Sequence, residues 1–80
     1  MTAAVDRAAG TCRIDGVAYR VTASGDGLAL YVKREGEAIA FGAFTRAIVF
    51  PGDAADHDEL VAIRTAWFAD EDAHTGDQGT

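Results

Sequence analysis

Side chains that could perform chemistry are few in this chain, and their spacing does not assemble a catalytic site. The single cysteine, Cys12, falls where alternation predicts a core-facing position, and His57 and His74 are 17 residues apart. A nucleophile needs a base within hydrogen-bonding reach, and the sequence places none beside Cys12. We therefore expect no enzymatic activity and no cofactor.

One short segment combines residue types that bind metals, namely Asp53, Asp56, His57 and Asp58. It lacks the loop glycine and the twelfth-position glutamate of an EF-hand, and it lacks the ligand spacing of a zinc site. With one cysteine, neither an internal disulfide nor a thiolate cage is possible, which is typical of a reducing cytoplasm. We expect no bound metal and a cytoplasmic location, and no apolar run approaches the roughly 18 residues of a membrane helix.

Acidic side chains are concentrated towards the end of the sequence. Residues 1–50 contain six basic and five acidic side chains, a net charge of +1, whereas residues 51–80 contain eight acidic side chains and one base, a net charge of −7. Clustered acid attracts basic partners and repels nucleic acid. The candidate partner-binding residues are Asp53, Asp58, Glu59, Asp70, Glu71 and Asp72.

These acids have a second interpretation, which the sequence leaves open. Acids at a helix start favour the positive end of the helix dipole, so Asp53, Asp58 and Glu59 have a structural explanation. Acids at a helix end are mildly unfavourable, so residues 70–72 either bind a partner or form a solubilising tail.

Secondary candidates are Arg20, Tyr31, Lys33 and Arg64. Alternation predicts Arg20 opposite Tyr31 on an outer sheet face, with Lys33 nearby. This mixture suits single-stranded nucleic acid, but the net charge of −6 opposes phosphate binding, so a protein interface or a solvated face is favoured. Arg64 falls within the apolar stripe of the predicted helix, where its guanidinium is expected to reach the rim or stack on Trp67.

The elements that position these residues are predicted from turn signals. Asp15-Gly16 and Glu35-Gly36 each separate alternating apolar residues, the pattern of a tight β-hairpin. Together with a four-residue loop at 24–27, they predict these opposed pairs: Ile14 with Val17, Cys12 with Tyr19, Val21 with Leu30, Tyr19 with Val32, Val32 with Ile39, and Leu30 with Phe41.

The alternation loses phase beyond Gly42: Phe44, Ile48 and Phe50 are expected on the inner face, but so would be Arg46 between them. We expect a separate strand over residues 45–50, ended by Pro51-Gly52, and the alternative is that this segment is the bent end of the fourth strand.

A helix is predicted from Asp56 to about Asp70. Asp56 and Glu59 have the spacing of a capping box, and Leu60, Ile63 and Trp67 form an apolar stripe. The sequence thus predicts an α+β domain over residues 11–72, a four- or five-stranded antiparallel β-meander with one C-terminal α-helix packed on one face. Residues 1–10 and 73–80 are expected to be mobile tails, the second of them acidic.

Small size, acidity and the lack of catalytic residues give the chain a general character that resembles phage-borne anti-CRISPR proteins, particularly small inhibitors of type I Cascade complexes. The resemblance covers the whole chain without a diagnostic motif. It implies nucleic-acid mimicry: an inhibitor that binds a basic site on a Cascade subunit and blocks recruitment of target DNA. The alternative is a bacterial accessory or assembly module that binds a partner or itself through its alanine-rich sheet face or an edge strand.

Overall fold

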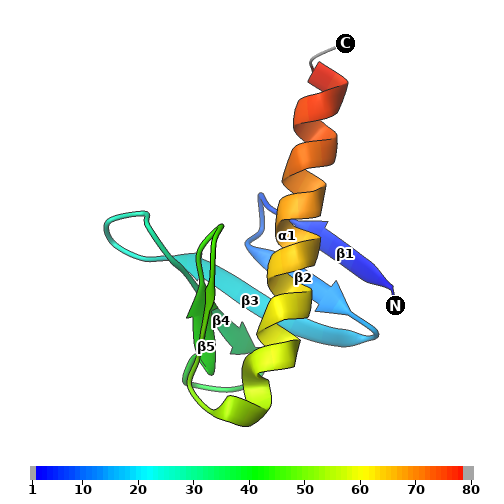
Figure 1. Ribbon diagram of the computed structural model, residues 1–80. Helices are drawn as coiled ribbons and strands as arrows, with labels where there is room; N and C mark the ends of the chain where they lie inside the picture. Colours follow the sequence, from blue (N-terminus) through cyan, green and yellow to red (C-terminus); the bar gives the residue numbers. More distant parts are fainter. Residues whose placement is uncertain (1, 79–80) are drawn as a thin grey trace.

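The computed structural model describes residues 2–78, and from residue 70 onward it describes the backbone alone. Six antiparallel strands form one sheet in sequential order, and one long helix lies across one face of that sheet (Figure 1). The strands are β1 (Ala3–Asp6), β2 (Thr11–Ile14), β3 (Val17–Ala23), β4 (Leu30–Arg34), β5 (Gly42–Phe44) and β6 (Val49–Pro51). They are followed by the 3₁₀ helix η1 (Ala54–Asp56) and by α1 (His57–Gln78).

The α+β architecture is as predicted, but there are six strands rather than four or five. The additional strand at the start is β1, which lies in the segment that we expected to be a tail and pairs with β2. The alanines of β1 show no alternation of apolar and polar residues, so the sequence does not indicate a strand, and β1 is held in the sheet by its pairing with β2. At the other end, α1 continues through the expected endpoint at Asp70 and through residues 73–78 of the second expected tail.

The Asp15-Gly16 hairpin has the predicted register. Ile14 is paired with Val17 and Cys12 with Tyr19. Asp15 and Gly16 have φ angles of 49° and 86°, and two positive φ values are what a type I′ turn requires, which explains the Asp-Gly sequence.

The two following registers differ from the prediction. Ser24 and Ala29 close a six-residue loop, with the Ser24 amide donating to the Ala29 carbonyl at 2.8 Å. Val21 is therefore opposite Val32 rather than Leu30. This slip of two residues leaves every side chain on its predicted face, because side chains alternate with a period of two.

A tight turn does form at Glu35-Gly36, where the Glu37 amide bonds to the Arg34 carbonyl at 3.0 Å, but the strand register predicted from it is wrong. Val32 is opposite Gly42 rather than Ile39, and residues 35–41 form a longer connection. Ile39, which was expected in the core, lies in this connection outside any strand and is 78% exposed, whereas Phe41 is buried as expected.

The chain after Gly42 forms the hairpin β5–β6 instead of one strand over residues 45–50. Thr45 closes its turn, because its side-chain oxygen accepts from the amides of Ala47 and Ile48, each at 3.2 Å. Arg46 lies in this turn, which explains the loss of phase in the alternation.

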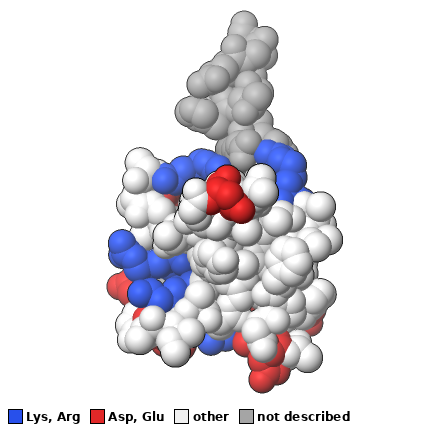
Figure 2. All heavy atoms as spheres, turned by 90° about the vertical axis from the view of Figure 1, so that its left-hand side faces the viewer, with Lys and Arg blue, Asp and Glu red and all other residues white. Residues whose placement is uncertain are grey.

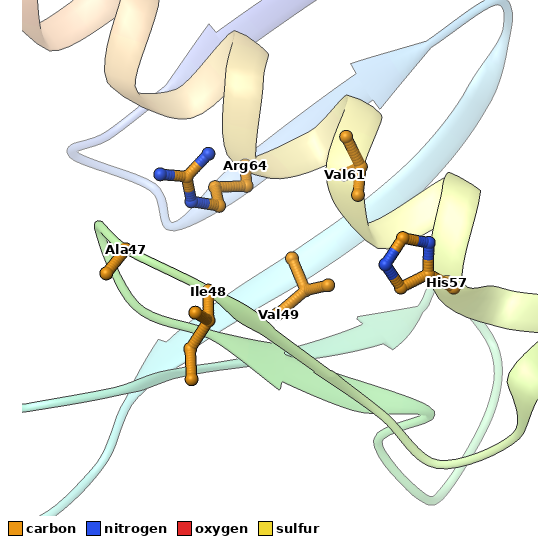
Figure 3. Close-up of a pocket in the computed structure, with 6 residues that line it drawn as sticks. All are labelled: Ala47, Ile48, Val49, His57, Val61 and Arg64. Atoms are coloured by element: carbon orange, nitrogen blue, oxygen red, sulfur yellow. The ribbon is translucent and has the colours of Figure 1, made fainter.

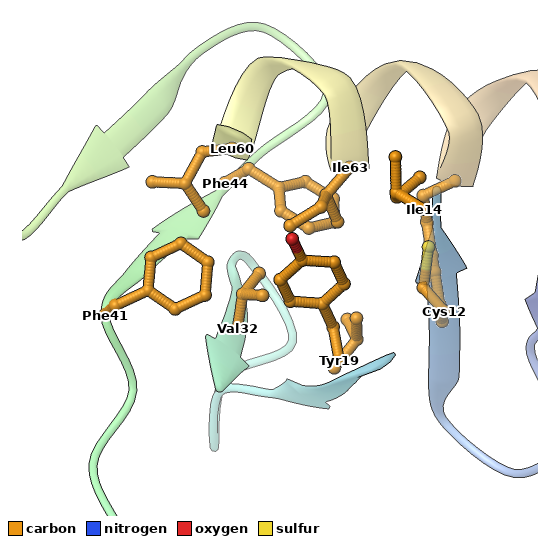
Figure 4. Close-up of a cluster of buried hydrophobic side chains, with 10 residues drawn as sticks. Cys12, Ile14, Tyr19, Val32, Phe41, Phe44, Leu60 and Ile63 are labelled. Carbon is orange, nitrogen blue, oxygen red and sulfur yellow. The ribbon is translucent and has the colours of Figure 1, made fainter. Parts of the chain in front are cut away.

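The core lies between the sheet and α1 (Figure 4). Phe44, Leu60, Ile63 and Val32 are its most deeply buried large side chains. The predicted core positions other than Leu30 and Ile39 are buried, and Leu30 packs against the cluster while partly exposed. These are the buried core residues: Cys12, Ile14, Tyr19, Val21, Val32, Phe41, Phe44, Leu60, Ile63 and Trp67.

The predicted capping box does not form. Asp53 caps η1 instead, accepting a hydrogen bond from the Ala55 amide at 3.0 Å. Asp56 lies within η1, and its side chain, like that of Glu59, binds Arg34. The short 3₁₀ turn moves the first cap three residues earlier than the sequence pattern indicates.

Candidate interaction surfaces

The predicted acidic site is divided by the structure into three different environments. Asp53 is used as a cap, and the Asp58 side chain is fully exposed at 102%. Glu59 is half-buried and bonded to Arg34 and Tyr19. The side chains of Asp70, Glu71 and Asp72 lie outside the described residues. Asp53 and Glu59 therefore have structural roles, and the Asp58 side chain is exposed to solvent.

Arg34 is the centre of a polar cluster that sequence reasoning missed. Its Nε and Nη2 donate to Glu59 Oε2 and Oε1 at 3.2 and 2.6 Å, and Nη2 also donates to Asp56 Oδ1 at 2.9 Å. Its guanidinium lies 4.1 Å from the centre of the Phe41 ring, a cation–π distance. The signal was present, because Arg34 has the same alternation parity as Val32 and must therefore share its inner face.

The Arg34 cluster shifts the protonation of two of its members. Hydrogen bonds from Arg34 hold the pKa of Glu59 below its ordinary value, against an opposing effect of burial. Burial, reinforced by the hydrogen bond to Glu59, raises the pKa of Tyr19. This cluster fixes the start of α1 on β3 and β4, which makes it a structural feature of the fold.

Cys12 and the histidine of the described region do not meet. Cys12 is buried, and burial raises the pKa of its thiol, which opposes nucleophilic attack. Among the residues with described side chains, no three His, Cys, Asp or Glu residues lie close enough to hold a metal ion.

The outer face of the sheet has a basic part over β3 and β4. Arg20 is exposed and stands opposite Lys33, not opposite Tyr31 as predicted. Tyr31 is opposite Thr22 in the same pair of strands. Within residues 2–69, neither Arg20 nor Lys33 has an ion-pair partner, so two like charges stand side by side, which is mildly unfavourable for the sheet.

An apolar part of the outer face adjoins this pair. Tyr31, Ala43 and Phe50 are opposed across β4, β5 and β6 and form one row. Tyr31 is 51% exposed and Phe50 49% exposed. Together with Ile39 and Ala40 they line a shallow groove of about 300 Å³. We call Tyr31, Ile39, Ala40, Ala43 and Phe50 the apolar patch.

Figure 2 shows the side of the molecule that carries β5. Lysine, arginine, aspartate and glutamate side chains lie around the margin of this side, and its centre consists of other residue types. Sequence reasoning missed the patch because the Glu35-Gly36 register turned Ile39 inwards and because Phe50 was assigned to the inner face.

A second groove lies between β6 and α1 (Figure 3). It has a volume of about 330 Å³ and is lined by Ala47, Ile48, Val49, His57, Val61 and Arg64. Arg64 reaches the rim as expected, but its Nε donates to the Thr45 carbonyl at 3.0 Å. Its guanidinium faces the Phe68 ring at 6.0 Å rather than stacking on Trp67, over which Arg7 lies.

Comparison with known protein families, with curated proteins and with solved structures finds no match for this chain. The class is therefore defined by the fold itself, a small α+β domain in which an antiparallel six-stranded sheet carries one helix. In the part of the chain that the structure describes, no helix is long and apolar enough to span a membrane.

Proposed function

We propose that this chain is a protein-binding domain that docks a partner protein on its apolar patch. The observation that carries the proposal is the exposure of Ile39, Tyr31 and Phe50 together around one groove. Scattered apolar side chains are ordinary on protein surfaces, but contiguous ones at a shallow depression are typical of protein interaction sites.

The fold does not need these side chains. Ile39 lies in the connection before β5, and Tyr31 and Phe50 point away from α1, so none of the three belongs to the core cluster. Polar side chains at these positions would be compatible with the same backbone conformation. Their apolar character is explained by burial against a partner.

The neighbouring charges indicate the chemistry of that partner. Arg20 and Lys33 lie on the same outer face as Tyr31, and neither has an ion-pair partner in residues 2–69. A partner surface with an apolar centre bordered by carboxylates would complement both parts, because opposite charges at an interface rim guide association.

Capture from the native host tests the proposal, using the immobilised parent chain and single variants. Ile39→Asp and Phe50→Asp should lose the retained protein, since they place a charge in the apolar patch. Val17→Asp is the matched control, because Val17 is 46% exposed but lies outside the patch. All three should melt near the parent temperature, since exposed substitutions change stability by only about 0.5 kcal/mol.

Two results would contradict this proposal. Retention that survives both patch variants would place the interface elsewhere. If the chain forms a dimer and the two patch substitutions dissociate it, the patch binds a second copy of the chain. That result would support the alternative of an assembly module that binds itself.

A second candidate function is occlusion of a basic, nucleic-acid-binding site on another protein, as in the anti-CRISPR proteins that the sequence resembles. The full exposure of Asp58 and the eight acidic side chains of residues 51–80 favour it. Changing Asp70, Glu71 and Asp72 to lysine should then slow association with the captured partner, chiefly at low salt. Unchanged kinetics at both low and high salt would reject occlusion and leave the apolar patch as the binding surface.

A further inference from the structure

The edge strand β6 offers backbone groups that the sheet does not use. β6 is the last strand in the sheet order. The Ile48 carbonyl accepts from Thr45, and the Gly52 amide donates to Phe41, so positions 48 and 52 face β5. Hydrogen-bonding direction alternates along an antiparallel strand, and the N–H and C=O of Val49 therefore turn to the open edge.

The groove between β6 and α1 runs beside this edge. His57, Val61 and Arg64 come from one side of α1 and face Ala47, Ile48 and Val49 (Figure 3). Val61 and Ile48 are exposed, and Val49 is partly so. The middle of the groove is therefore apolar, with a polar group at each end.

Arg64 gives the groove its charge preference. It lies at the end formed by the turn at 45–48, where only its Nε is engaged, with the Thr45 carbonyl. Within residues 2–69 its two Nη groups have no hydrogen-bond or ion-pair partner. A guanidinium that keeps these donors free binds a carboxylate well, because charge-assisted bonds are roughly twice as strong as neutral ones.

The dimensions suit an extended chain. His57 and Arg64 are separated by seven positions, which at about 1.5 Å per helical residue is about 10 Å. Three residues of an extended chain span about the same distance at about 3.4 Å each. One strand segment can thus pair with Val49, place an apolar side chain between Val49 and Val61, and set a carboxylate at Arg64.

We propose that this groove binds an extended acidic segment of a partner protein, which adds to β6 as a seventh strand. This site is separate from the apolar patch, which lies on the outer face. The acidic end of this same chain is not the occupant, because its residues 70–78 are helical. Strand addition to an exposed edge obtains affinity from backbone hydrogen bonds and specificity from side-chain pockets.

A synthetic peptide tests the site directly. The probe is acetyl-Thr-Val-Asp-Val-Glu-amide, titrated into the isotope-labelled full chain and followed through backbone amide NMR signals. We expect saturable shifts at residues 47–51 and at 57–64, and none around Ile39 and Tyr31. A peptide with lysine in place of both acids should not bind, and neither should one methylated at the central backbone nitrogen.

Chain variants separate this groove from general adhesion. Arg64→Gln should weaken binding of the acidic peptide about tenfold, the usual effect of losing a charge-assisted hydrogen bond. Val61→Asp should weaken it further, and because Val61 is exposed this variant should keep the fold. Ile39→Ser is the matched control and should bind as the parent does. A version of the probe ending in a free carboxyl reports whether Arg64 prefers a terminal or a side-chain carboxylate.

The proposal fails if the acidic peptide leaves the amides of residues 47–51 unchanged at saturating concentrations. It also fails if the lysine peptide binds equally well, or if Arg64→Gln and Val61→Asp, both folded, bind as the parent does. None of these outcomes bears on the proposal for the apolar patch, because that surface is tested separately by the Ile39→Asp and Phe50→Asp variants.

Discussion

The hydroxyl of Tyr19 donates a hydrogen bond to the carboxylate of Glu59, which follows it in the sequence by 40 residues. Arg34 donates to both oxygens of the same carboxylate. One acidic side chain of α1 is thereby bonded to two adjacent strands. The apolar core ends at this point, and the three polar side chains fix the start of the helix on the sheet.

Glu59 should make stability depend on pH in the acid range. Its pKa is lower in the folded chain than the ordinary value of 4.5, so its contribution is present above that value and is lost as the pH falls through the lower folded pKa. Glu59→Gln should reduce the free energy of unfolding at neutral pH by about 1 to 2 kcal/mol. It should also flatten the decline below pH 4.5. Denaturant unfolding at a series of pH values measures both effects.

The control for this experiment is Asp58→Asn, whose side chain is fully exposed. It should keep the acid decline of the parent. If Glu59→Gln loses stability equally at all pH values, the carboxylate charge is not what Arg34 stabilises.

Tyr19 should resist ionisation in the folded state. Its pKa is raised from the ordinary 10.0 by burial and by the bond to Glu59, so the unfolded chain loses this proton first and stability falls as pH rises above 10.0. Tyr31→Phe leaves Tyr19 as the only tyrosine. In this variant the ultraviolet absorbance of tyrosinate should appear together with the loss of folded circular dichroism. Tyrosinate forming near pH 10.0 in a folded chain would contradict the bond.

Gly42 should not tolerate a side chain. A Cβ at this position would lie 2.4 Å from Leu60 Cδ1 and 2.9 Å from the Phe50 carbonyl oxygen. The second neighbour is backbone and cannot move cheaply, so Gly42→Ala should cost about 1 to 3 kcal/mol through overpacking. Gly25→Ala is the matched control, because a Cβ there meets nothing within 4 Å. Thermal melts of the two variants should separate clearly, and equal melting temperatures would show that both Leu60 and the backbone at Phe50 can shift to make room.

Trp67 should contribute strongly to stability. It is 4% exposed, and Trp67→Ala should cost about 3 to 5 kcal/mol. Trp67→Phe should cost less than half as much, because it also removes the Nε1 donor, which is buried without a hydrogen-bond partner in the described residues. Chemical denaturation measures the two losses. A loss in Trp67→Phe of more than half the loss in Trp67→Ala would contradict an unsatisfied Nε1.

The sequence predicted the Asp15-Gly16 hairpin correctly because a two-residue turn leaves the chain no choice of register. The Glu35-Gly36 hairpin was wrong because the chain does not pair with β4 directly after the turn, and β5 begins only at Gly42. The predicted capping box was wrong because Glu59 instead bonds to Arg34, which lies 25 residues earlier in the chain. A contact at that separation is invisible to a local pattern.

The candidate site was predicted less well than the fold. Arg20 and Tyr31 do lie on the outer face as predicted, because a shift of two residues in the β3–β4 register leaves each side chain on the same face of the sheet. The apolar patch depends on Ile39, which lies outside the strands in the connection before β5. The apolar patch combines the connection at 35–41 with β4, β5 and β6, so it could be recognised only once the pairing of these strands was known.

The order of elements has a consequence for synthesis. Leu60, Ile63 and Trp67, which cover the inner face, follow all six strands in the sequence. The hairpins form from neighbouring segments and can fold early, but their apolar face stays open until this part of α1 has left the ribosome. During that interval the nascent sheet is a target for chaperones and for aggregation.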